Sequence, residues 1–598
     1  MLFRSEIKPA YVLAKAYLDG TPLSTGVMRE MEKDDDAKYQ EAWSKVEPFL
    51  VEKGWKGSTC PVIAEFTTSA VKEACMIVLG RELETQVRKL DRLADAVDLL
   101  DSPLSGKLAD MIRANDVVSV QSWMQDDFVP EPGINLNSPK QMRDLIYTTL
   151  GLPVRVVNNA TDNERANNPA LARAVTKHKK IWAGKLDAEL TDEEKELLKQ
   201  KAKTNAIAMD FAAVFDNDNP NVGMLKALKA LKSVDTRRKM FYRPYRFVQH
   251  WKDGRIHAGV RQVGTVTRRM SSSGPNLQQL PKKGDGVRFR EAFVPHHSKA
   301  VIVSIDFSGQ ELRLGAGQSM DPNMLDCYVG DNLKDMHSLT AAGAMVKKWG
   351  IAKVKELAET VGLPCEGEDW AYALFSALRK HSDKAVAKLA DDLRKVAKNV
   401  NFGAQYDAMA PKLAETLIIP VADAETFLNA KFAMFPRFEV WKDEVKTELK
   451  SKGYATTMMG ARRHLAVKLL SDDGWEKEKA LRQGPNYKIQ GSGAEMTKLS
   501  MARLWDSGAL YKYDARLIAP IHDELVASVA AKDVVEFIRE MHTCMTQPYS
   551  NLPVPIFGSI SLGPSLGTQY EAGDVFDADA ITNILELIKE KHCGAKAV

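Results

Sequence analysis

Two acidic residues stand where apolar strands are predicted to end or turn. Asp306 closes the run VIVSIDF (301–307), which predicts a buried strand with a carboxylate at the rim of a sheet. Asp523 follows His522 in IAPIHDELVASV, where the pattern predicts a tight turn between two strands. Carboxylates at a sheet rim suit a divalent cation, although either aspartate alone is more typical of an ordinary turn.

Between these residues, LRKVAKNVNFGAQYDAM predicts a helix with a chemically mixed face. Four side chains recur at every fourth position, and a step of four residues drifts by only about 40° around a helix. They are Arg394, Lys398, Phe402 and Tyr406. Two cations followed by two aromatic rings suit a nucleotide, with charge for phosphates and flat rings for sugar and base. A core stripe with snorkelling basic side chains would give the same spacing.

The rest of the chain must bring these groups together. A chain of 598 residues is too long to fold around a single hydrophobic core. Its composition, with 27% charged and 44% hydrophobic residues, is typical of a folded protein. The net charge of +4 does not by itself indicate nucleic-acid binding. No apolar run reaches the roughly 18–20 residues of a membrane helix. Scattered cysteines without a C-x-x-C pair predict a cytoplasmic location without zinc or disulfides.

Most of the sequence has apolar residues at spacings of three and four, which is typical of helices. Three runs are instead rich in β-branched residues, at 301–307, 515–529 and 553–563. This pattern predicts a predominantly helical α+β fold whose sheet is assembled from distant segments.

Motifs in one order identify a family that the chain resembles, the family A DNA polymerases of bacterial DNA polymerase I and certain phage replicases. They are DFSGQELR (306–313), DMHSLTA (335–341), RKVAKNVNFGAQY (394–406), MMGARRH (458–464) and HDE (522–524). The resemblance implies a right-hand fold with an antiparallel palm sheet. It divides the chain into a thumb (1–246), a first palm segment (247–322), fingers (323–477) and a second palm segment with the C-terminal tail (478–598).

The resemblance implies template-directed addition of deoxynucleotides to a primer 3′ end by two-metal phosphoryl transfer. Asp306 and Asp523 would hold two Mg²⁺ ions, for which Mn²⁺ can substitute. The backbone carbonyl of Phe307 would be a further metal ligand, and Glu524 would support catalysis. Primer–template DNA and deoxynucleoside triphosphates are the implied partners.

The resemblance also assigns residues to the incoming nucleotide. His337, Arg394 and Lys398 would bind the triphosphate, and Lys398 would also be the general acid to the leaving pyrophosphate. Glu311, packed near Tyr406, would exclude a ribose 2′-hydroxyl. Phe402 predicts discrimination against dideoxynucleotides. Positions along the duplex minor groove are matched by Arg269, Asn276, Gln278, Arg482, Asn486, Gln490 and His522.

Several positions depart from the family pattern. Asp407 and Arg268 each stand where the family usually has glycine. Pro485 should kink the helix that carries Arg482 and Asn486. The segment DAETF (423–427) has the D-x-E-T spacing of a metal-binding strand in an exonuclease. We predict instead that Asp423 caps the start of a helix.

Two insertions and one charged stretch extend the prediction. Residues 56–131 form a helical insertion in the thumb, with a net charge of −5 that argues against clamping DNA. This insertion is either a docking module for a processivity or exonuclease partner or a purely structural addition. A second insertion is expected in the fingers at about 345–390. Residues 226–246 carry eight basic side chains and one acidic side chain, which predicts a DNA-backbone surface.

The thumb-like sequence begins near residue 5, so we expect no 3′–5′ exonuclease domain in this chain, and a compact polymerase with insertions suggests a phage enzyme. A single-subunit RNA polymerase is the main alternative, but Glu311 and Phe402 favour deoxyribose. A reverse-transcribing relative stays open. An inactive primer–template-binding scaffold would normally have lost a carboxylate.

Overall fold

The computed structural model describes residues 2–53, 63, 65–79, 83, 89–100, 102, 104–127, 135–181, 185–242, 253–282, 285–331, 333–367, 369–549 and 552–593. The chain divides into two compact units. Unit 1 comprises 1–37, 179–183 and 233–598, and unit 2 comprises 38–178 and 184–232. Across the described ranges, no helix is both long and apolar enough to cross a membrane.

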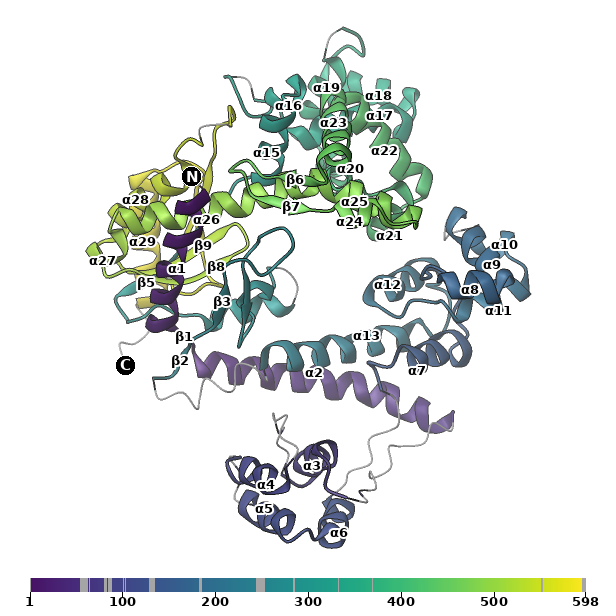
Figure 1. The fold of residues 1–598 in the computed structure, drawn as a ribbon. Coiled ribbons are helices and arrows are strands. Elements are labelled where there is room, and N and C mark those ends of the chain that lie inside the picture. The colour runs from purple at the N-terminus through teal and green to yellow at the C-terminus, as the bar shows by residue number, and fades with distance from the viewer. Residues whose placement is uncertain are drawn as a thin grey trace. The chain divides into compact units, whose positions relative to one another are not determined.

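Unit 1 is built on a five-stranded antiparallel sheet with the order β11-β10-β5-β9-β8 (Figure 1). Its strands are β5 (Ala300–Phe307), β8 (Arg516–Ile521), β9 (Glu524–Ala530), β10 (Gly558–Gly563) and β11 (Tyr570–Gly573). All three β-branched runs contribute strands, and the first pairs with strands from the other two. The sheet and the many helices around it confirm the predicted α+β fold.

The central strand β5 is buried on both faces, because alternate side chains of a strand point to opposite sides. Val301, Val303 and Ile305 enter a large core that includes helices on one side of the sheet. Ile302 enters a second core with Phe289 and other aromatic side chains. Double-sided burial explains the continuous apolar run and fixes the position of the polar residue at its end.

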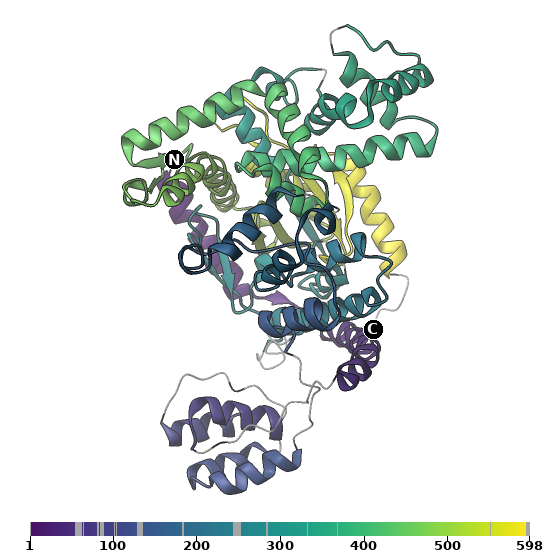
Figure 2. The same cartoon turned by 90° about the vertical axis from the view of Figure 1, so that its right-hand side faces the viewer.

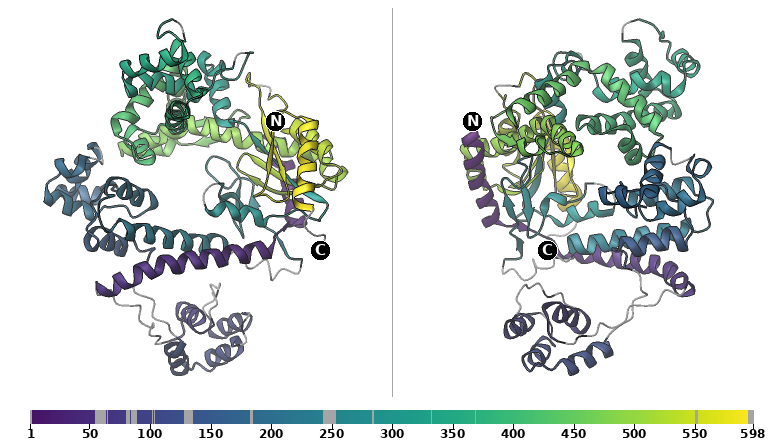
Figure 3. Two further views of the ribbon diagram at one scale, coloured as in Figure 1. Left: turned by 180° about the vertical axis from the view of Figure 1, so that it is seen from behind. Right: turned by 45° about the vertical axis from the view of Figure 1, so that its right-hand side comes forward.

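Helices pack against this sheet from several segments of unit 1 (Figure 3). Those in direct contact with its strands are α1 (Leu2–Asp19), α28 (Val534–Thr546) and α29 (Ala578–Ile588). Helices α15 (Gln310–Ser319), α26 (Ser492–Asp506) and α27 (Ala509–Lys512) contribute side chains to the same core. Short strands and turns complete the region, namely β1 (Thr21–Pro22), β2 (Arg255–Ile256), β3 (Gly259–Arg261), β4 (Ser271–Ser273), η6 (Leu277–Gln279) and η7 (Asp285–Ala292).

A second group of helices lies within residues 323–477 and has its own core of alanine, leucine and phenylalanine side chains. Its members are α17 (Met336–Trp349), α18 (Ile351–Val361), α19 (Trp370–Arg379), α20 (Lys384–Gln405), α21 (Ala410–Leu417) and α22 (Val421–Met434). The next helix, α23 (Pro436–Lys452), instead buries Phe438, Trp441 and Val445 in the large core beside the sheet. The prediction for Asp423 is wrong, because α22 begins at Val421 with Pro420 as its N-cap. Asp423 instead lies in the first turn and pairs with Lys348.

Pro485 lies inside a helix that continues past it, where the sequence predicted a kink. Helix α25 (Gly474–Asn486) continues through Pro485 into a π-helical turn, η8 (Tyr487–Gly491), and then into α26. Proline lacks the N–H that the α-helical ladder uses, and a π-turn lets the chain change its hydrogen-bond register without ending the helix.

Unit 2 is helical. Its elements include α7 (Pro139–Arg143), η2 (Asp144–Thr149), α8 (Asp162–Asn167), α9 (Pro169–Lys180), α11 (Asp192–Lys199) and α12 (Ala206–Phe215). The long helices α2 (Thr25–Glu52) and α13 (Val222–Arg237) run from one unit into the other. The four-part division of the chain into thumb, palm and fingers stays a prediction.

The described part of the 56–131 segment forms a helical bundle (Figure 2). Its helices are α3 (Thr68–Ala74), η1 (Cys75–Leu79), α4 (Leu90–Asp98), α5 (Ser105–Arg113) and α6 (Val117–Asp127). They enclose a core of their own, in which Val71, Leu93, Leu108 and Val120 are fully buried. The described residues of this segment are therefore largely helical, and its place as an insertion in a thumb stays a prediction.

Candidate polymerase site

The rim of the sheet brings Asp306 and Asp523 together. Asp306 pairs with Glu524 across β5 and β9, and Ile521 pairs with Glu524 across β8 and β9. The turn between β8 and β9 therefore contains only His522 and Asp523, and the positive φ of 59° at His522 suits such a tight turn. The Phe307 N–H donates to the Asp523 carbonyl oxygen at 3.3 Å, which fixes this turn against the end of β5.

Both carboxylates have a raised pKa. Burial and the charge of Asp523 raise the pKa of Asp306 to about 6. Burial also raises the pKa of Asp523. Like charges at a partly desolvated site disfavour double ionisation, and a cation would relieve this repulsion.

A lysine provides positive charge at this rim. Lys282 Nζ lies 2.9 Å from Asp306 Oδ2 and 3.0 Å from Glu524 Oε2. Arg290 also contacts Glu524, with Nη2 3.2 Å from Oε1. Glu524 is therefore a buried, doubly paired carboxylate, whereas Asp306 keeps a buried Oδ1 that has no hydrogen-bond partner in the described structure.

This donor set fits a divalent cation that shares its ligands with a substrate. Asp306 Oδ1 is free to bind, and the Asp523 carboxylate lies beside it on the turn. In the described part of the chain, no three His, Cys, Asp or Glu side chains are grouped to hold a metal alone. Mg²⁺ commonly takes one or two carboxylates and completes its shell with water and phosphates.

The predicted nucleotide-binding helix is α20, capped at its start by Asp383. Arg394, Lys398 and Phe402 lie within it, whereas Tyr406 directly follows its last residue. Lys398 is exposed and, within the described ranges, has no ion pair. The Phe402 ring lies 5.8 Å from the His337 ring, measured between centroids. The helix thus brings two cations and an aromatic ring to the start of α17.

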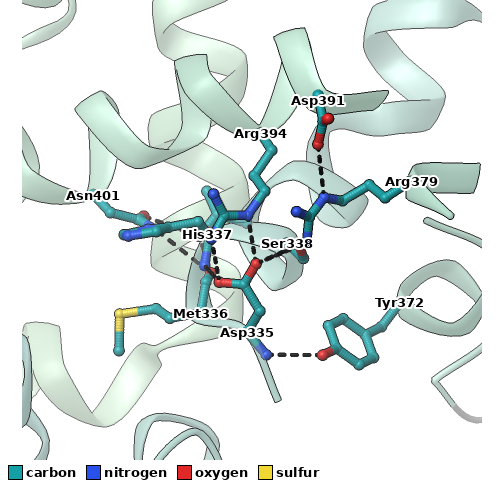
Figure 4. Close-up of polar contacts among 10 residues, drawn as sticks. Asp335, Met336, His337, Ser338, Tyr372, Arg379, Asp391, Arg394 and Asn401 are labelled. Carbon is teal, nitrogen blue, oxygen red and sulfur yellow. Dashed lines mark hydrogen bonds and ion pairs between the residues drawn. The ribbon is translucent and has the colours of Figure 1, made fainter. Parts of the chain in front are cut away.

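Asp335, which caps α17, holds Arg394 (Figure 4). Arg394 Nε and Nη2 lie 2.5 Å and 3.1 Å from the two Asp335 oxygens. Burial raises the pKa of Asp335, but hydrogen bonds from Arg394 and Ser338 outweigh it and leave the pKa at about 2. Asp335 was not singled out from the sequence, although its place two residues before His337 was visible in DMHSLTA.

Asn401 fixes His337. Its amide nitrogen lies 3.1 Å from His337 Nδ1, and its amide oxygen accepts a hydrogen bond from Thr340. Burial lowers the pKa of His337 to about 4, so the ring is neutral at pH 7. With Nδ1 as acceptor, the proton resides on Nε2, which can donate to an anionic ligand. Sequence reasoning missed Asn401, which lies one residue before Phe402.

Glu311 pairs with Arg269 through an ion pair between Oε1 and Nη2. Its backbone carbonyl accepts a hydrogen bond from the Gln405 side chain at 2.9 Å, which ties α15 to the end of α20. Burial raises the pKa of Glu311. The Tyr406 hydroxyl is buried and has no hydrogen-bond partner among the described residues.

Gln278 and Asn276 have contacts within the protein. Gln278 Oε1 accepts the His522 N–H at 2.9 Å, and its amide nitrogen donates to the Pro520 carbonyl. Asn276 Oδ1 accepts the Gln278 N–H at 3.0 Å. These bonds attach η6 to the turn that carries Asp523. Their predicted DNA contacts stay predictions.

The remaining predicted DNA contacts lie along α25 and η8. Arg482, Asn486 and Gln490 are spaced by four residues, while neighbouring Leu481 and Tyr487 are buried. Asn486 Oδ1 has no hydrogen-bond partner in the part of the chain described. The contacts of these three residues with DNA stay predictions.

Both departures from glycine have a backbone explanation. Asp407 and Arg268 have φ of 54° and 63°, the left-handed region that glycine enters most easily. The Asp407 side chain is bound by Lys442, with Nζ 2.7 Å from Oδ1. A buried ion pair thus accompanies this strained position at the end of α20.

Part of the basic stretch 226–246 serves a structural role. Arg237 is buried and binds Asp35 through Nε and Nη2 at 2.6 Å and 2.7 Å. Tyr242 donates to the same carboxylate at 2.8 Å. Arg237 is therefore not available as a DNA-backbone contact, and residues 243–246 lie outside the described structure.

An antiparallel sheet with two carboxylates at its rim, together with a helix that carries Arg394 and Lys398, is the arrangement expected of the right-hand polymerase class. The sequence profile of DNA polymerase family A matches residues 183–356 and 368–568, more than half of the chain. The chain therefore belongs to DNA polymerase family A.

Individual proteins with similar sequences support the same family assignment. DNA polymerase I of Helicobacter pylori strain J99 is 25% identical over 502 residues, covering 83% of this chain and 44% of that protein. Thermostable DNA polymerase I of Thermus aquaticus is 29% identical over 318 residues, or 52% of this chain and 33% of that protein. The chain thus spans less than half the length of these curated relatives, which are bacterial; the phage source stays a prediction.

A solved structure supports the fold. It is the polymerase domain of Pol1 from M. smegmatis in complex with DNA primer-template and dNTP. The two chains align with a TM-score of 0.58 and 20% identity, covering 94% of this chain and 70% of the other. The likeness agrees with the predicted right-hand architecture.

Proposed function

We propose that this chain is a template-directed DNA polymerase that adds deoxynucleotides to the 3′ end of a primer. One observation carries the proposal: the Phe307–Asp523 backbone bond brings Asp523 to the end of the strand that holds Asp306. Two neighbouring carboxylates with raised pKa values do not stabilise the edge of a sheet. Phosphoryl transfer, in contrast, requires carboxylates that can hold cations to neutralise the charge of the phosphates.

In the proposed reaction, the primer 3′-hydroxyl loses its proton to solvent and its oxygen forms a bond to the α-phosphorus, while the bond from this phosphorus to the bridging oxygen of pyrophosphate breaks. Arg394 and the Nε2–H of His337 would hold the triphosphate. Lys398 would give a proton to the departing pyrophosphate, for which its exposed ammonium group is suited. Phe402 would lie against the sugar.

Asp306, Asp523 and the Phe307 carbonyl would hold Mg²⁺, with Mn²⁺ as a substitute. The bound ions would neutralise charge on the phosphates and on the attacking and leaving oxygens. The unpartnered Asp306 Oδ1 supports this assignment. Lys282 would have to leave Asp306 Oδ2 or share it with the ion, because the two cations compete for one carboxylate.

Glu311 would exclude ribonucleotides, since its carboxylate is fixed by Arg269 close to Asp523. Arg269, Asn276, Gln278, Arg482, Asn486, Gln490 and His522 would face the primer–template duplex. Amide and guanidinium donors there can test base-pair geometry without reading sequence, because the minor groove offers similar acceptors at every pair.

Residues 56–131 would serve as a docking module for a processivity or exonuclease partner. Their separate core supports a module that is stabilised by its own packing. Deleting the segment and measuring product length with and without a cell or viral extract tests this role. Unchanged product lengths in both conditions would leave the bundle a purely structural addition.

Primer extension tests the main proposal. DNA and RNA templates are each supplied with deoxy- and ribonucleotides, and Asp523→Asn is compared with Asp218→Asn, an exposed aspartate of unit 2. We expect extension of DNA templates with deoxynucleotides by the wild type and the control only. Extension with ribonucleotides would indicate an RNA polymerase, and tight primer–template binding without extension would indicate a scaffold.

A further inference from the structure

The Asp335 carboxylate is bound by two arginines, of which only Arg394 belongs to the predicted nucleotide site. Arg379 Nη1 lies 3.3 Å from Asp335 Oδ2 and 3.3 Å from Ser338 Oγ. The Tyr372 hydroxyl accepts the Asp335 N–H at 2.8 Å. Arg379 and Tyr372 both come from α19 and approach Asp335 from the same helix (Figure 4).

The position of α19 is fixed by packing. Leu374 and Phe375 are fully buried, and Leu378 is 1% exposed. All three belong to the core shared with α17 and α20. Arg379 is held further by Asp391 of α20, with Nε 3.0 Å from Oδ1. Its guanidinium is therefore oriented on two sides before any ligand binds.

The family match is interrupted at residues 357–367, immediately before α19. This gap lies within the segment predicted as a fingers insertion. Asp335, His337 and Arg394 lie in motifs that the sequence shares with the family, whereas Arg379 and Tyr372 lie in none of them. Helix α19 itself lies within the second matched range, 368–568, and adds two contacts to Asp335 that no quoted motif contains.

We propose that Arg379 and Tyr372 form a positioning site that acts through Asp335 to make Arg394 available to a nucleoside triphosphate. The proposal rests on the proposed polymerase function. Before the nucleotide binds, Asp335 holds Arg394 through the Nε and Nη2 atoms of its guanidinium group. When the triphosphate attracts Arg394, Asp335 keeps Arg379 as its counter-ion, so that no half-buried carboxylate is left unpaired.

This arrangement predicts how Arg379 affects binding. Without Arg379, Arg394 would be the one remaining cation that the described structure places on Asp335, and Asp335 would compete more strongly with the triphosphate for it. Loss of Arg379 should therefore weaken nucleotide binding although Arg379 itself does not contact the nucleotide. The effect should disappear when Asp335 is neutral, because the competition has then been removed.

The experiment is a double-mutant cycle on Arg379 and Asp335. The variants Arg379→Gln, Asp335→Asn and the double variant are compared with Lys380→Gln, which removes an exposed charge next to Arg379. The equilibrium Kd for dNTP on the enzyme–primer–template complex and the KM and kcat of extension are measured. We expect Arg379→Gln to raise Kd and KM about three- to tenfold with a smaller change in kcat.

Arg379→Lys should recover part of the loss, and Tyr372→Phe should raise Kd more modestly. In the Asp335→Asn background, Arg379→Gln should leave Kd unchanged. A change in Kd of equal size in both backgrounds would overturn the proposal, as would a loss of thermal stability with normal Kd. If the wild type binds dNTP but does not extend primers, the polymerase function fails while the Kd cycle still decides this inference. If the wild type binds no dNTP, both fail.

Discussion

Lys282 Nζ lies 2.9 Å from Asp306 Oδ2, so that a lysine side chain contacts the carboxylate to which we assign the metal. The same ammonium group lies 3.0 Å from Glu524 Oε2. A positive charge at this position stabilises neighbouring carboxylates that would otherwise repel one another. It also competes with any divalent cation for Asp306.

Replacing Lys282 should separate these two effects. We expect Lys282→Gln to lower the free energy of unfolding in EDTA by about 1–2 kcal/mol, because partly buried carboxylates lose a counter-ion. The same change should tighten Mn²⁺ binding, measured by electron paramagnetic resonance. Lys299→Gln, at an exposed position before β5, is the matched control. Weaker Mn²⁺ binding by Lys282→Gln would mean that the lysine assists the cation.

The raised pKa of Asp306 predicts a pH dependence of stability without metal. Because its folded pKa of about 6 exceeds the ordinary 3.8, the folded state binds the extra proton between about pH 4 and 6. Asp306 therefore favours folding below this window, and its contribution falls as pH rises through it. The difference should be on the order of 1 kcal/mol, since a side chain that is 39% exposed is partly screened by solvent.

Thermal unfolding in EDTA from pH 4 to 8 measures this contribution. Relative to wild type, Asp306→Asn should gain stability as pH rises from 4 to above 6. The comparison between variants removes the titration of other groups. A constant difference across this range would contradict the raised pKa.

Phe402 predicts selection against dideoxynucleotides. A tyrosine hydroxyl at this position could supply the hydrogen bond that the missing 3′-hydroxyl no longer makes. We expect Phe402→Tyr to improve dideoxynucleotide incorporation on the order of 100-fold relative to deoxynucleotides. Phe432→Tyr, at a part-exposed phenylalanine of α22, is the control. An unchanged ratio for Phe402→Tyr would refute the placement of this ring against the sugar.

Substitutions of Glu311 test whether the volume or the charge of its side chain excludes ribonucleotides. If its side chain excludes the 2′-hydroxyl by volume, Glu311→Ala should raise ribonucleotide incorporation by about 10- to 100-fold. Glu311→Gln keeps the volume but loses the ion pair with Arg269, so it should continue to exclude ribonucleotides. Equal effects of the two substitutions would show that the charge, rather than the volume, is responsible.

Strong local patterns in the sequence allowed several elements to be predicted. A continuous apolar run predicted β5, and the His522–Asp523 dipeptide between two β-branched runs predicted the tight turn. The spacing of four residues predicted the mixed face of α20. These features depend on local sequence, namely the spacing of apolar or charged residues in a strand or helix and the residue types in a short turn.

Other features depend on tertiary contacts that no local pattern records. Lys282 lies in a loop, and its approach to Asp306 follows from the packing of η6 and η7 near the sheet. Arg379 reaches Asp335 only because α19 packs on α17 and α20. The left-handed backbone at Asp407 explains why glycine is usual there, but a sequence with aspartate does not reveal it.

The most direct test of the account is the single-turnover rate of nucleotide addition by Asp306→Asn and Asp523→Asn on a saturating primer–template. We predict that each variant keeps its affinity for the duplex and loses at least about 1,000-fold in rate, because each carboxylate would neutralise charge at the reacting phosphate. A rate within about tenfold of wild type for either variant would contradict the assignment of the active site to this sheet rim.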